Sequence, residues 1–102
     1  MAQFDVYRAP EIFGDIAYFL DIQSDLLRVT ETRVLVPLMQ KSVAPPAIGR
    51  LNPELVIRNK TYVAQFQDIQ SHSVIDFGRA TDNFAARRYD FVTAFDLLIS
   101  GI

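Results

Sequence analysis

The chain contains no cysteine, which excludes disulfide bonds and thiolate chemistry. It has one histidine, His72, and a zinc site needs several ligands. His72 lies in a polar stretch with no catalytic partner nearby, so we interpret it as a solvated loop residue. No glycine-rich phosphate loop and no GxSxG nucleophile motif occurs. These absences predict a protein that is not an enzyme and that uses no metal or other cofactor.

Positive charge is also scarce. Ten Lys and Arg face twelve Asp and Glu, and Arg87-Arg88 is the only adjacent basic pair. We therefore expect no direct nucleic-acid binding, because neutralised phosphates supply most of the affinity of such proteins.

No apolar run reaches the roughly eighteen residues that span a membrane, and the first residues lack the apolar stretch of a signal peptide. We expect a cytoplasmic protein without membrane contact.

Apolar residues are plentiful: 50% of the 102 residues are hydrophobic and 12% are aromatic. This suits one domain over residues 1–102. β-rich runs, several of them alternating, predict strands at residues 3–7, 17–23, 32–38, 54–58, 61–66 and 73–77. Asn59-Lys60 would be the turn of a hairpin, and residues 40–52 an irregular excursion. Pro37 lacks a backbone donor, so its strand should lie at an edge, be bulged or end there.

The final segment changes period. Its apolar residues fall mostly three, four or seven apart, as on an amphipathic helix. They are Phe84, Tyr89, Phe91, Val92, Phe95, Leu98 and Ile99. Asp82 or Asn83 can cap the start of this helix, and Gly101 can form a left-handed cap at its end. The predicted fold class is mainly β, an antiparallel curled sheet with one C-terminal α-helix.

Residues 19–27 read Phe-Leu-Asp-Ile-Gln-Ser-Asp-Leu-Leu. This segment resembles the CcdB family, which has an aromatic–aliphatic–Asp–aliphatic–Gln–Ser–Asp–aliphatic–aliphatic segment there. Residues 3–7, the strand at 32–38 that ends in Pro-Leu, and the Gly-Ile ending of residues 97–102 agree in the same order. The resemblance covers essentially the whole chain. It implies the small SH3-like, barrel-like sheet with a C-terminal helix that CcdB shares with MazF-type toxins.

The resemblance also implies a function. The protein would be the homodimeric toxin of a toxin–antitoxin pair of the plasmid-maintenance type, neutralised by a CcdA-like antitoxin with a flexible arm. It would bind the A subunit of DNA gyrase and trap the enzyme with cleaved DNA. Carried over by position, the gyrase-binding residues would be Leu26, Leu27, Asp96, Ile99, Ser100, Gly101 and Ile102.

Ser100 departs from the best-known family pattern, which has tryptophan before Gly-Ile. A tryptophan anchor is often worth about 2 kcal/mol or more at an interface. The departure leaves three possibilities open: weaker gyrase binding, compensation by other residues, or a different target.

Other interpretations remain open at this stage. A MazF-type ribonuclease would need a basic groove, which Arg33, Arg50, Arg58 and Arg79 could form if they converge. A degenerate toxin would bind only its antitoxin. The terminal Ser100-Gly101-Ile102 could simply stop the helix.

The residues around the Gln-Ser-Asp turn also have structural interpretations. Of the adjacent Leu26 and Leu27, at least one is expected to be buried, because neighbouring strand side chains alternate. Asp21 and Asp25 are interpreted as local hydrogen-bonding residues rather than an acid–base pair.

Overall fold

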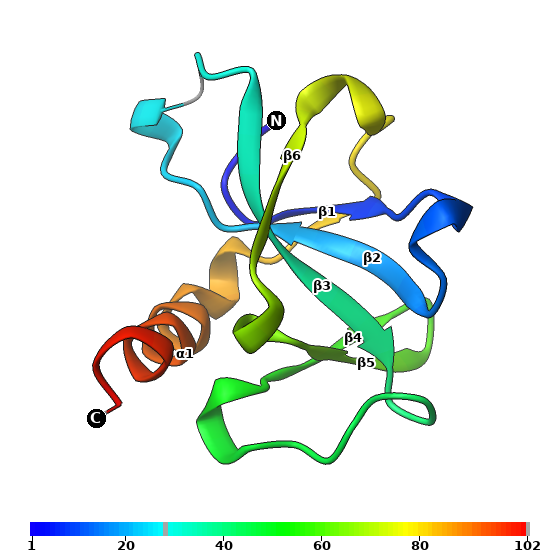
Figure 1. The fold of residues 1–102 in the computed structure, drawn as a ribbon, viewed down its shortest axis with the longest axis vertical. Helices are drawn as coiled ribbons and strands as arrows, with labels where there is room; N and C mark the ends of the chain where they lie inside the picture. Colours follow the sequence, from blue (N-terminus) through cyan, green and yellow to red (C-terminus); the bar gives the residue numbers. More distant parts are fainter. Residues whose placement is uncertain (28, 102) are drawn as a thin grey trace.

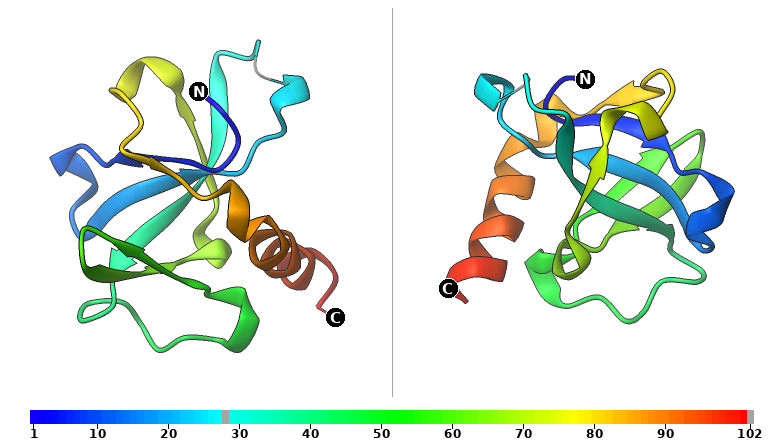
Figure 2. Two further views of the ribbon diagram at one scale, coloured as in Figure 1. Left: turned by 180° about the vertical axis from the view of Figure 1, so that it is seen from behind. Right: turned by 45° about the horizontal axis from the view of Figure 1, so that its top comes forward.

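The computed structural model describes residues 1–27 and 29–101, and in that part of the chain seven strands and one α-helix are joined by short 3₁₀ turns (Figure 1). The elements are β1 (Asp5–Arg8), β2 (Ile16–Asp21), β3 (Thr32–Gln40), β4 (Glu54–Ile57), β5 (Lys60–Ala64), β6 (Gln70–Ser73), β7 (Asp82–Asn83) and α1 (Arg88–Ser100). The strand order is β4-β5-β3-β2-β1-β7, β6 pairs with β3, and every pairing is antiparallel. The sheet curls and α1 stands beside it, as Figure 2 shows from two further directions. The predicted fold class is confirmed.

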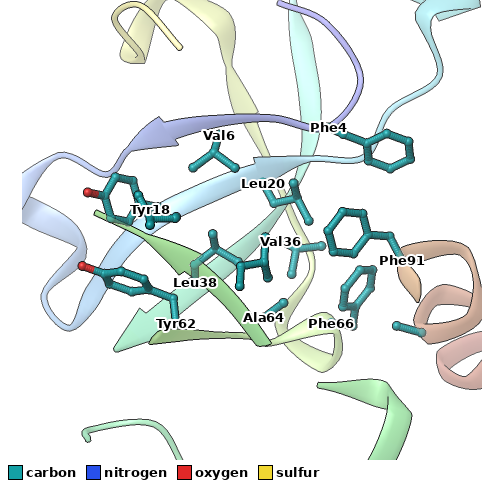
Figure 3. Packing of buried hydrophobic residues seen from close by; sticks show 13 residues of the cluster. Phe4, Val6, Tyr18, Leu20, Val36, Leu38, Tyr62, Ala64, Phe66 and Phe91 are labelled. Atoms are coloured by element: carbon teal, nitrogen blue, oxygen red, sulfur yellow. The ribbon is translucent and has the colours of Figure 1, made fainter. Parts of the chain in front are cut away.

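The inner face of the curled sheet encloses the hydrophobic core (Figure 3). Alternate residues of each strand point inward, which is the expected consequence of the two-residue period of a strand. The strand residues in this core are Val6, Tyr18, Leu20, Val36, Leu38, Leu55, Ile57, Tyr62 and Ala64. The helix closes the core with Phe91, whose ring centroid lies 5.4 Å from that of Phe4 and 6.3 Å from that of Phe66.

The outer face of β1, β2 and β3 carries a second, aromatic layer. Phe19 is fully buried there, with ring centroids of Phe13, His72 and Phe77 at 5.1, 5.3 and 5.6 Å. The interpretation of His72 as a solvated loop residue is therefore wrong. It lies on β6 and is half-buried. The polar residues around it gave no strand pattern, although they form a strand beside an aromatic surface.

Pro37 lies in the middle of the central strand, which differs from the expectation of an edge or a strand end. β6 pairs with the first half of β3 up to Leu35, and β5 pairs with the second half from Leu38. The Pro37 carbonyl, between these halves, accepts a hydrogen bond from the Gln65 N–H at 2.9 Å. Since N and O of one strand residue point to the same side, the missing donor of Pro37 falls where β3 changes partners.

Three element boundaries also differ from expectation. The hairpin turn is Arg58-Asn59, one residue earlier than predicted; both residues have positive φ (50° and 67°), as a type I′ turn requires. The last predicted strand, 73–77, is wrong, because Ser73 ends β6 and residues 74–76 form a 3₁₀ turn. The α-helix begins only at Arg88, since the predicted caps at 82–83 pair with β1 as β7.

The end of the helix is as predicted. Gly101 adopts the left-handed conformation (φ 71°, ψ 17°), and its N–H donates to the Leu97 carbonyl at 2.9 Å. No helix in the described part of the chain is long and apolar enough to cross a membrane.

Replacing Phe91 with alanine should lower the free energy of unfolding by about 3–5 kcal/mol, because it removes the ring that joins α1 to the core. Tyr89→Ala makes a similar change on the same helix at a side chain that is 76% exposed, and should shift stability by only about 0.5 kcal/mol. Urea unfolding of both variants measures the difference. Equal losses would show that the helix does not dock through Phe91.

Candidate functional site

Leu26 and Leu27 lie on a 3₁₀ turn, η2 (Asp25–Leu27), that directly follows the Gln-Ser residues. Their side chains are 92% and 54% exposed, so the expectation that at least one is buried is wrong. Strand alternation does not apply to a 3₁₀ turn, which lets both side chains face solvent. Two adjacent exposed leucines form an apolar projection suited to contact with a partner.

A buried ion pair holds the chain just before this projection. Arg33 on β3 and Asp21 at the end of β2 are 1% and 0% exposed, and Arg33 Nε donates to Asp21 Oδ2 at 2.7 Å. Arg33 Nη2 donates both to Asp21 Oδ1 (3.1 Å) and to the Gln23 carbonyl (3.2 Å). Asp21 Oδ1 also accepts from the Gln23 N–H at 2.9 Å. The pair thus fixes the backbone of Gln23 from both its N–H and its carbonyl.

The Gln23 side chain connects this fixed backbone to the η2 turn and to β3. Its amide Nε2 donates to the Leu27 carbonyl and to Thr30 Oγ1, both at 2.8 Å, and its Oε1 accepts from the Val34 N–H at 3.1 Å. Asp25 Oδ1 accepts from the Gln3 N–H at 2.9 Å, which ties the turn to the N-terminal segment. Asp21 and Asp25 are therefore local hydrogen-bonding residues, as expected, and do not converge as an acid–base pair.

Burial sets the protonation behaviour of this region. Loss of solvent raises the pKa of Asp21, while hydrogen bonds from Arg33 and Gln23 act against that rise. Burial also raises the pKa of Tyr7 well above its usual range, with Asp5 adding to the effect because Asp5 Oδ2 accepts the Tyr7 hydroxyl proton at 3.0 Å. Tyr7 therefore stays protonated and serves as a hydrogen-bond donor. Within the described residues, no three His, Cys, Asp or Glu side chains are arranged to hold a metal ion.

The second group of predicted site residues forms the tip of α1. Ile99 is 69% exposed, and Asp96, Ser100 and Gly101 are exposed as well. The Ser100 hydroxyl donates to the Asp96 carbonyl one turn back, at 2.7 Å. Its donor is therefore used within the helix, and Ile99 is the apolar side chain that this tip presents. Ile102 lies outside the described residues.

The two groups do not meet within one chain. In Figures 1 and 2, η2 and the C-terminal end of α1 lie on the same side of the molecule but at opposite ends of it. Between the residues that precede β1, the residue that follows β2 and the helix, a groove of about 140 Å³ is lined by Gln3, Phe4, Ile22, Phe91, Val92 and Phe95. Sequence reasoning missed this groove, because its residues come from segments far apart in the chain.

The arginines that could have formed a ribonuclease groove are dispersed. Arg33 is buried in its ion pair, Arg50 lies on the 3₁₀ turn η3 (Gly49–Leu51), and Arg58 lies in the β4–β5 turn. Arg79 follows η5 (Val74–Asp76), and Figures 1 and 2 show the η5 turn at the other end of the molecule from η3. Arg33 is therefore not available to line a surface groove, and the other three arginines belong to separate loops.

A family model described as "CcdB protein" matches residues 3–101. The chain belongs to the CcdB family. Within the segment that carried the resemblance, residues 19–27, the part from Asp21 to Asp25 of this CcdB-family chain connects the last residue of β2 to the first residue of η2. No curated protein sequence matches it significantly.

One similar solved structure is an endoribonuclease in complex with its cognate antitoxin from mycobacterial species. The TM-score is 0.76, with 97% of this CcdB-family chain and 94% of that chain covered, at 17% sequence identity. At this identity the similarity shows a shared fold.

Gln23→Ala should release the η2 turn, because it removes three hydrogen bonds at once. The Val34 amide loses its acceptor, Gln23 Oε1, and the Leu27 amide, which donates to the Ser24 carbonyl within the turn, becomes accessible when the turn opens. Both amides should exchange faster with deuterium, and the free energy of unfolding should fall by about 1–3 kcal/mol. Gln23→Glu keeps an acceptor for the Val34 N–H but loses the donors to Leu27 and Thr30. It should therefore speed exchange at Leu27 and leave Val34 protected. Unchanged Leu27 exchange in both variants would contradict the role assigned to Gln23.

Proposed function

We propose that this protein is the toxin of a toxin–antitoxin pair, that it binds the A subunit of DNA gyrase and traps it with cleaved DNA, and that an antitoxin neutralises it. Membership of the CcdB family over residues 3–101 is the observation that carries the proposal. The similar fold of an endoribonuclease solved in complex with its cognate antitoxin supports the antitoxin as a partner.

The surface of the chain supports action by binding. Leu26, Leu27 and Ile99 are exposed apolar side chains at two places, each held by a fixed backbone: the hydrogen-bonded η2 turn and the end of a capped helix. Fixed apolar projections lose little conformational freedom on association, so more of the contact energy remains as affinity. This is the arrangement a protein needs if it acts by docking rather than by chemistry of its own.

A homodimer is the second part of the proposal. Val92 and Phe95 are 42% and 38% exposed and lie on one face of α1, beside the groove that contains Phe4 and Ile22. The neighbouring face, with Phe91 and Ala94, is already packed on the core. A two-fold axis beside this face would cover it with the same face of a second copy. Such a dimer would also double the number of projecting η2 turns and helix tips.

The gyrase proposal is tested with purified protein, gyrase, relaxed plasmid and ATP. Linear DNA released on denaturation should accumulate, and deletion of residues 100–102 should abolish it while leaving folding and antitoxin binding intact. Ser100→Trp should increase cleavage at a given concentration, because it restores an aromatic anchor at the helix tip. Undiminished poisoning by the truncated chain would rule out the helix tip as a contact.

The dimer proposal is tested by light scattering on Phe95→Glu, which places a charge on the exposed apolar face of α1. Wild-type protein should have the mass of two chains and the variant the mass of one, since an unpaired charge at an apolar interface is costly. Tyr89→Glu makes the same kind of change on another face of the helix and should remain dimeric. A monomeric wild-type protein, or two dimeric variants, would refute this interface.

A ribonuclease remains the second candidate, because the similar solved structure is described as an endoribonuclease. The net charge of -2 does not favour it, and of the four arginines considered for its groove Arg33 is buried in an ion pair. Incubation with a long single-stranded RNA, without gyrase, separates the candidates. Fragmentation would favour the ribonuclease, and intact RNA together with cleaved plasmid would favour the gyrase poison.

A further inference from the structure

A cleft of about 310 Å³ lies between the irregular segment after β3 and the first turns of α1. It is lined by Arg50, Pro53, Arg87, Tyr89, Asp90 and Thr93. None of these residues belongs to the η2 turn or to the helix tip. The cleft is therefore a separate feature of the surface from the proposed gyrase-binding residues.

One wall of the cleft is a rigidly held guanidinium. Arg87 Nε donates to Asp90 Oδ2 at 2.7 Å, Nη1 donates to the Glu54 carbonyl at 3.0 Å, and the group lies 5.9 Å from the centroid of the Phe91 ring. Its Nη2 makes no hydrogen bond to any residue that the structure describes. A guanidinium fixed in this way keeps donors in place for an incoming acceptor, at little further cost in side-chain freedom.

The facing arginine is free to engage a ligand. Arg50 lies on η3 and forms no ion pair with any carboxylate in the described ranges 1–27 and 29–101. Counting Arg50, Arg87 and Asp90, the lining carries a local charge of +1 in a chain whose net charge is -2. Tyr89, 76% exposed, stands at the same cleft, and Tyr and Arg are enriched among residues that dominate binding energy.

We propose that this cleft binds a carboxylate side chain of the antitoxin. The inference rests on the proposed toxin–antitoxin function and adds to it the site and the chemistry of recognition. A carboxylate suits the site because arginine pairs with it through short, charge-assisted hydrogen bonds. Pro53 and the Tyr89 ring offer apolar surface to the aliphatic stem that bears the carboxylate.

The charge pattern favours a polypeptide over nucleic acid. A phosphate backbone needs a run of cations, whereas the lining here offers two arginines together with the carboxylate of Asp90. The position of the cleft favours the antitoxin over gyrase. Arg87 immediately precedes α1 and Ser100 ends it, thirteen residues or about 20 Å apart along the helix axis, and the cleft extends along the helix only as far as Thr93.

The consequence is that antitoxin binding and gyrase poisoning can be separated by substitution. Arg50→Glu should weaken binding of the cognate antitoxin about ten- to a hundredfold in calorimetry, because it replaces the guanidinium with a carboxylate that repels the carboxylate of the antitoxin. The same variant should cleave plasmid with gyrase as efficiently as wild-type protein. Arg79→Glu changes charge equally at an exposed site away from the cleft and should leave both properties unchanged. Circular dichroism checks that both variants are folded.

Each other outcome overturns the inference in a recognisable way. Wild-type antitoxin affinity in Arg50→Glu would show that the cleft is not used, while the proposed function would stand. Equal loss of antitoxin and gyrase binding would show that one surface serves both. Binding of a single-stranded RNA oligonucleotide that Arg50→Glu abolishes would make the cleft a nucleic-acid site. If wild-type protein binds neither antitoxin nor gyrase, the proposed function fails together with the inference.

Discussion

A guanidinium placed where water cannot reach it must be neutralised within the fold, and the Arg33–Asp21 pair meets this constraint. Removing either partner would leave an uncompensated buried charge, which typically costs about 3–5 kcal/mol. One atom of the pair, Arg33 Nη1, makes no hydrogen bond to a described residue. The hydrogen bonds of Nε and Nη2 therefore hold the guanidinium in place. The pair joins the ends of β2 and β3, and both backbone groups of Gln23 depend on it.

The helix shows how one short element can serve two surfaces. Phe91 and Ala94 close the core, while Val92, Phe95 and Ile99 remain exposed on the neighbouring face. A soluble protein rarely leaves a contiguous apolar face uncovered. The second apolar side of this helix therefore marks a surface for contact with a partner. The proposed dimer accounts for most of this second face and leaves the end of the helix for a larger partner.

Much of the fold follows from local pattern. Two-residue alternation placed five of the strands, and Gly101 marked the end of the helix, because these features depend on nearby residues alone. The failures have tertiary causes. Residues 70–73 form a strand only because β3 and an aromatic surface lie beside them, and residues 82–83 pair with β1 from the other end of the chain. Pro37 is tolerated in a central strand because two partners divide that strand between them.

In the candidate site, too, the local sequence identified segments but not their tertiary contacts. The segment Asp21-Ile22-Gln23-Ser24-Asp25 was recognisable by its residues, but its hydrogen bonds to β3 and to the N-terminal segment were not. The exposure of both Leu26 and Leu27 follows from a 3₁₀ turn that no pattern in the sequence announced. Arg50 and Arg87 share a cleft although they are 37 positions apart in the sequence, and only the fold brings them together.

The pairing of β7 with β1, and of Phe91 with Phe4, bears on the order in which the molecule assembles. These contacts join residues 4–6 to residues 82–91, so each closes a loop that contains most of the chain. Loop closure is slow when sequence separation is large, whereas the β4–β5 hairpin needs only a two-residue turn. The helix is therefore expected to dock late, after the central strands have formed. During synthesis, the end of the chain proposed to poison gyrase would be the last part to reach its working position.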